Sequence, residues 1–61
     1  MTDADKLTTL YQRLAAEQKR LVEVAAGQQV IPTESMLRRI GDLESALTAV
    51  STQIEHVQGS E

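Results

Sequence analysis

Cysteine is absent from this 61-residue chain, which excludes disulfide bonds and thiolate metal sites. Tryptophan and phenylalanine are also absent and there is one tyrosine, so any core must be built from aliphatic side chains. The one histidine, His56, would need several carboxylates beside it to hold a metal ion, and we expect it at the surface. With no catalytic motif in the sequence, we expect no enzymatic activity, no metal and no cofactor.

Proline and glycine are scarce, with one and three residues, which is typical of long helices. No apolar run approaches the ~18 residues that cross a membrane. The polar start MTDADK does not resemble a secretory signal, so we expect a cytoplasmic protein. The formal net charge of −3 weighs against nucleic-acid binding, which needs a basic surface.

Apolar residues recur in steps of three and four on both sides of one linker, GQQVIP. This pattern predicts an all-α fold with helices over about 3–26 and 33–57, joined by a turn at 27–32. Residues 58–61 are expected to fray. Similar helix lengths and a short connection predict that the whole chain, 1–61, is a single antiparallel hairpin.

Capping signals support these bounds. Thr2 or Asp3 can cap the first helix and Thr33 the second, because their side-chain oxygens accept bonds from free backbone N–H groups. Gly27 is expected to end the first helix in the left-handed conformation.

Pairing the two helices gives a register in which apolar positions meet, for example Leu14 with Leu47. The one mismatch sets Glu17 opposite Leu43. We expect the Glu17 carboxylate to reach the edge of the seam and pair with Arg13, Arg20 or Arg39, because burying it alone would be costly. The predicted core is Leu7, Leu10, Leu14, Leu21, Ile40, Leu43, Leu47, Val50 and Ile54, with Val24 opposite Met36.

A single pair of helices leaves the flanks of both apolar stripes in water, and a small core rarely supplies more than ~3–5 kcal/mol. We therefore expect self-association, with two hairpins forming a homodimeric four-helix bundle of coiled-coil type; a larger helical partner would use the same surface. Tyr11, the one aromatic residue, is the best hot-spot candidate. The candidate residues for self-association or partner binding are Leu7, Leu10, Tyr11, Leu14, Glu17, Leu21, Met36, Leu37, Ile40, Leu43, Leu47, Val50 and Ile54. Further candidates are Val22, Val30 and Ile31.

Val30 and Ile31 in the linker have two interpretations. They can fold back and plug the end of the helix pair, which we expect, or they can form an exposed contact at the tip. Gly41, in the middle of the second helix, costs ~1 kcal/mol relative to alanine unless a second backbone approaches there.

Four basic residues, Lys19, Arg20, Arg38 and Arg39, lie at similar height in the hairpin. We expect them to be neutralised by nearby carboxylates, with Arg38 bonded to Glu34 and Asp42 at a spacing of four residues. The alternative is a contact patch for an acidic partner or RNA.

In layout the chain resembles three kinds of short two-helix hairpin: plasmid copy-control RNA-binding dimers, small co-chaperones of type III secretion, and phage inhibitors of host regulators. The stretch LESALTAV, 43–50, is loosely similar to the second helix of the co-chaperones. The resemblance implies a protein-binding regulator or chaperone-like module, with an RNA-binding dimer or a structural oligomerisation module as alternatives. It carries over no functional residue.

Overall fold

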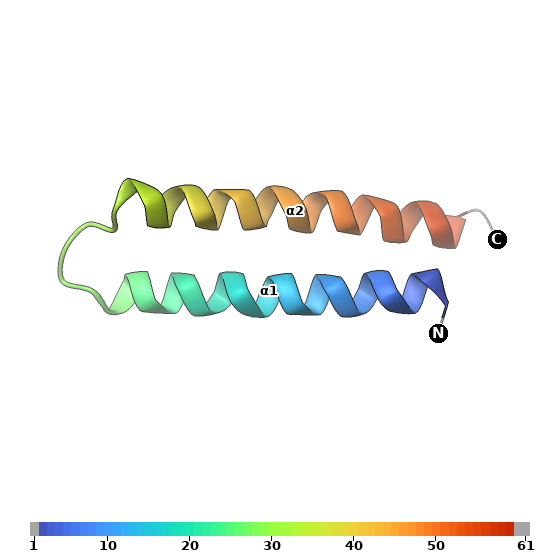
Figure 1. Ribbon diagram of the computed structural model, residues 1–61, viewed down its shortest axis with the longest axis horizontal. Coiled ribbons are helices and arrows are strands. Elements are labelled where there is room, and N and C mark those ends of the chain that lie inside the picture. Colours follow the sequence, from blue (N-terminus) through green and yellow to red (C-terminus); the bar gives the residue numbers. More distant parts are fainter. Residues whose placement is uncertain (1, 60–61) are drawn as a thin grey trace.

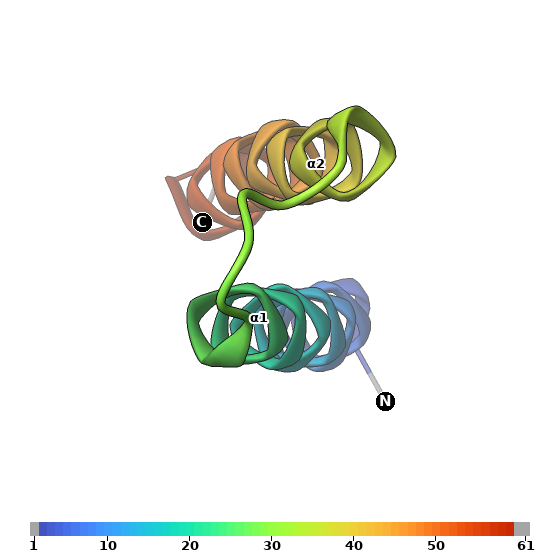
Figure 2. The same cartoon turned by 90° about the vertical axis from the view of Figure 1, so that its left-hand side faces the viewer.

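The computed structural model describes residues 2–59 as two helices lying side by side (Figure 1). Helix α1 spans Asp3–Gly27 and helix α2 spans Glu34–Gly59. The described residues contain no strand, and the molecule measures 48 × 17 × 12 Å. The predicted all-α antiparallel hairpin is confirmed. Viewed along its length in Figure 2, the hairpin has helix axes inclined to one another, as interleaved side-chain ridges require.

Both helices begin at the predicted threonine caps. The Thr2 hydroxyl accepts a bond from the Asp5 N–H at 3.1 Å, and the Asp5 carboxylate accepts one from the Thr2 N–H at 3.4 Å. This reciprocal capping box satisfies two donors that the helix itself leaves free. At the start of α2, the Thr33 hydroxyl accepts a bond from the Met36 N–H at 3.2 Å. Short polar side chains therefore fix where each helix starts.

The helix ends differ from prediction. Between residues 2 and 59 no glycine has a positive φ, so the left-handed ending predicted for Gly27 is wrong. Instead Gln28 leaves α1 in extended geometry, with φ −82° and ψ 144°, and donates its N–H to the Ala25 carbonyl at 3.2 Å. The connection runs outward before it returns, so no tight reversal is needed at Gly27. Helix α2 continues through residues 58 and 59, where fraying was predicted; residues 60 and 61 lie outside the described residues.

The core of the hairpin is thin. Within residues 2–59, the buried apolar side chains are Leu21, 6% exposed, and Leu47, 7% exposed. The rest of the seam is half-buried, because one helix can cover only one side of another. The half-buried seam residues are Leu7, Leu14, Met36, Ile40, Leu43, Val50 and Ile54.

Helix α1 is rotated relative to the prediction. Leu10 and Val24 are each 43% exposed, so their predicted places in the core are wrong. Between the leucines at 7, 14 and 21, the helix can turn one of two residues toward α2. This residue follows each leucine by either three or four positions. The packing favours the second choice in the later turns: Gln18 and Ala25 are half-buried, and Gln18 donates from Nε2 to Glu44 Oε2 at 2.7 Å, whereas Tyr11 is 37% exposed. That bond joins residues one position beyond Glu17 and Leu43, so the register lies close to the predicted one.

Candidate interaction surface

The rotation of α1 leaves a line of side chains beside the seam, which we call the flank row: Leu10, Glu17 and Val24. These residues are seven positions apart, so they lie along one side of the helix. Helix α2 leaves the two aliphatic members each 43% exposed, and about a third of the Glu17 side chain is exposed. The flank row is therefore accessible without opening the hairpin.

Of the three arginines predicted to pair with Glu17, Arg20 of the same helix is the one that bonds it. Arg20 donates to its carboxylate from both Nε, at 3.4 Å, and Nη2. The hydrogen bond from Arg20 lowers the pKa of Glu17 below its ordinary value of 4.5, and the nearby positive charge of Arg39 acts in the same direction. The same bond raises the pKa of Arg20. At neutral pH the flank row therefore carries a charged, hydrogen-bonded carboxylate at its centre.

The connection between the helices, residues 28–33, forms the tip of the molecule (Figure 1). Val30 is 73% exposed and Ile31 is 87% exposed, so the prediction that they plug the end of the helix pair is wrong. The physical reason is the extended path of the chain, which arcs beyond the helix ends and carries both side chains into solvent. The segment VAAGQQVIPT, 24–33, has no charged residue. The tip is thus an apolar, neutral projection.

The predicted contact residues fall into two sets. Tyr11 and Leu37 are exposed, like Leu10, and Val22 is also exposed. These residues are available to a partner. Val30 and Ile31 are exposed at the tip, and Glu17 lies half-buried in the flank row. The remaining candidates are buried or half-buried in the seam between α1 and α2, so a partner could reach them only along its edges.

The four basic residues are only partly neutralised. Lys19 lies 4.0 Å from Glu23, and Arg20 pairs with Glu17. Within residues 2–59, no carboxylate oxygen lies within 4.0 Å of Arg38 or Arg39, so the ion pairs predicted for Arg38 are not formed. In a chain of net negative charge, these two arginines remain open to an acidic group.

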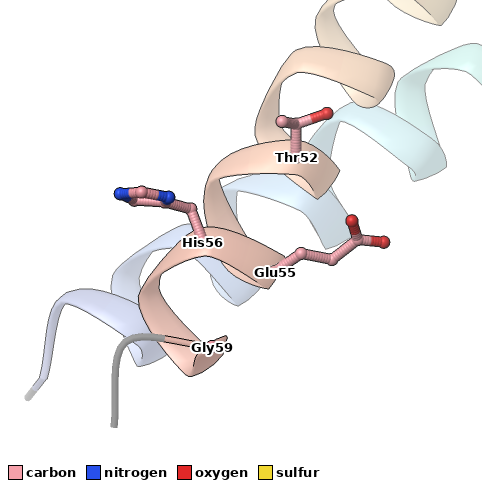
Figure 3. Close-up of a pocket in the computed structure, with 4 residues that line it drawn as sticks. All are labelled: Thr52, Glu55, His56 and Gly59. Carbon is pink, nitrogen blue, oxygen red and sulfur yellow. The ribbon is translucent and has the colours of Figure 1, made fainter.

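A shallow depression lies near the end of α2. It is lined by Thr52, Glu55, His56 and Gly59, and Figure 3 shows the Glu55 and His56 side chains pointing in different directions. In the part of the chain that the structure describes, histidine, aspartate and glutamate side chains do not gather in a group that could hold a metal ion. Neither described helix is long and apolar enough to span a membrane.

Comparison of the chain with protein families, curated protein sequences and solved structures gives no match. Sequence reasoning missed the half-buried position of Gln18 and its bond to Glu44 of α2. The signal that could have found it is the row Tyr11, Gln18 and Ala25, which has the same seven-residue spacing as the flank row.

Proposed function

We propose that this chain is a small, non-enzymatic protein–protein interaction module of the cytoplasm. It self-associates through the flanks of its helical seam, and it binds a larger protein, which it inhibits or chaperones. The observation that carries the proposal is the contrast between the thin core and the exposed apolar side chains of the flank row and the tip.

Self-association has an energetic rationale. A core of this size rarely supplies more than ~3–5 kcal/mol, and this chain has no disulfide to add to it. Each 100 Å² of apolar surface buried against a second copy adds ~2.5 kcal/mol of transfer free energy before the costs of association. The flank row is one surface where such burial is available.

The tip supplies the contact with a larger protein. Val30 and Ile31 are both β-branched, so their side chains lose little rotamer freedom when bound. Pro32 favours extended geometry at Ile31, which further lowers the cost of ordering. Because the tip is uncharged, the complementary site is an apolar pocket with no charge to satisfy.

Sedimentation equilibrium of the pure protein over a range of micromolar concentrations tests self-association. A folded monomer at every concentration would refute that half of the proposal. A dimer with a dissociation constant in this range would support it.

Affinity capture tests the tip with matched variants. The double variant Val30→Ser, Ile31→Ser should keep its helical circular dichroism and lose the captured protein. The control Gln28→Ser, Gln29→Ser changes the same loop but keeps both apolar side chains, and it should capture as wild type does. Equal capture by all three proteins would exclude the tip as the contact.

The open arginines favour a second candidate, an RNA-binding hairpin dimer. Arg38 and Arg39 form no ion pair within residues 2–59, although the charge of Arg39 acts on Glu17, so both guanidinium groups keep N–H donors for phosphate. In that case affinity for a duplex RNA should fall steeply with salt and with charge reversal of both arginines. A purely structural oligomerisation module would bind only itself in both experiments.

A further inference from the structure

The flank row is exposed in the hairpin, and its surroundings point to the molecule that covers it. A compact folded protein of 6.7 kDa exposes roughly 3,900 Å² of surface. This chain exposes 4803 Å², an excess of roughly 900 Å². A standard-size interface buries about 800 Å² on each partner. The elongated hairpin therefore exposes in excess about the area that one stable contact with another molecule covers.

The order of residue types in the flank row is the same when it is read from either end: an aliphatic residue, an acidic residue and an aliphatic residue. Leu10 lies seven positions before Glu17, and Val24 lies seven positions after it. A two-fold contact requires one patch to be complementary to itself. Two antiparallel copies of this row meet that condition when both are centred on Glu17, because each Leu10 then faces a Val24.

The charges around the centre fit the same arrangement. Two facing carboxylates would repel one another, but each Glu17 is already bonded to Arg20 of its own helix. Arg13, one turn before Glu17, has no carboxylate within 4.0 Å among residues 2–59. In the antiparallel pair, Arg13 comes within about one turn of Glu17 in the other copy. The centre would thus hold two carboxylates among four arginines.

We propose that a second copy of this chain docks antiparallel on the flank row, with Leu10 against Val24 of the second copy and the two Glu17 side chains at the two-fold axis. This inference rests on the self-association in the proposed function and specifies its geometry. A symmetric occupant is favoured over an unrelated protein because the aliphatic ends of the row match each other and each unpaired Arg13 comes within about one turn of the opposite Glu17.

The absence of cysteine makes the geometry directly measurable, since any disulfide must come from an introduced residue. A disulfide forms only where Cα atoms come within ~7 Å, so facing positions are selected. Under mild oxidation, Glu17→Cys should form linked dimers at least about tenfold faster than Ala16→Cys, because facing thiols are held at high effective concentration. Ala16 is the matched control, since it is exposed and adjacent in sequence but points away from the row.

The direction of packing is read from two further variants. Leu10→Cys and Val24→Cys, one of them carrying a longer tag, should give mostly the mixed dimer when combined and little linked product alone. Linked products from each variant alone, with no excess of the mixed product, would overturn the antiparallel geometry in favour of parallel packing. Equal rates for Glu17→Cys and Ala16→Cys would overturn the contact at the flank row altogether.

Failure of this inference is distinguishable from failure of the proposed function. A wild-type protein that sediments as a dimer, combined with slow oxidation of Glu17→Cys, rejects only the geometry. A wild-type protein that is monomeric rejects self-association itself, and the flank row is then free for a different partner. Circular dichroism of each variant confirms that the hairpin is intact, which is expected because none of the substituted residues is fully buried.

Discussion

Replacing Leu21 with alanine, in comparison with the same change at Leu10, tests which side of α1 faces α2. Leu21 is 6% exposed and Leu10 is 43% exposed. Truncating a buried leucine removes its transfer free energy and leaves a cavity, at ~2–5 kcal/mol. A seam this close to solvent can partly collapse, so we expect the lower end, ~2–3 kcal/mol, for Leu21→Ala.

Leu10→Ala should cost much less within a single hairpin. Each fully buried methylene is worth ~0.8 kcal/mol, and at Leu10 a large part of the side chain is already in water with no enclosed cavity to form. We therefore expect a loss of about 1 kcal/mol or less. In a domain of this size 1 kcal/mol shifts the melting temperature by ~4–8 °C. Leu21→Ala should then lower it by roughly 10–20 °C and Leu10→Ala by less than about half as much.

The assay is thermal and urea denaturation followed by circular dichroism at several protein concentrations. Dilution to the monomeric range isolates the stability of the hairpin from that of any assembly. Equal losses for the two variants in that range would refute the rotated packing of α1. A loss at Leu10 that appears only at higher concentration would instead place this residue between copies.

Three further predictions concern local features. Gly41→Ala should stabilise the hairpin by ~1 kcal/mol in a thermal melt, because an added Cβ meets no atom within 4 Å; a weaker dimer in the same variant would reveal a close second backbone. Thr33→Ala should lose ~1 kcal/mol with the cap of α2, and Thr33→Ser should restore most of it, as urea denaturation will show. Glu17→Gln should weaken the dependence of the free energy of unfolding on pH under acidic conditions. Because the folded pKa of Glu17 lies below 4.5, its contribution is complete above that pH and is lost as pH falls through the lower folded value, and Arg20→Gln should remove the same part of the pH dependence in melts at stepped pH.

The parts of the fold that the sequence predicted well depend on local chemistry. Thr2 and Thr33 cap their helices as expected because capping needs only neighbouring residues. The unbroken seam of α2 left one choice of face, and its residues from Met36 to Ile54 are buried or half-buried as predicted.

The failures occurred where the local pattern had two solutions. In α1, leucines seven residues apart fit two neighbouring faces of the helix. The packing decides whether the row that contains Leu10 or the row that contains Gln18 turns toward α2. At the tip, Val30 and Ile31 are apolar, but their path depends on how far the connection extends beyond the helix ends. Neither question can be answered from periodicity alone. The pairing of Glu17 with Arg20 was predictable, because the two residues share one turn of one helix.

If the tip binds a partner as proposed, its placement at one end of the hairpin determines how many partner molecules one dimer can hold. The N- and C-terminal ends of the described chain lie together at the opposite end (Figure 1). When two hairpins pack antiparallel, their tips point in opposite directions, separated by nearly the length of the rod. Two binding ends so arranged cannot close on one small target. They would instead bridge two separate partner molecules, so the assembly would act as a bivalent cross-linker with the stoichiometry of two partners to two chains.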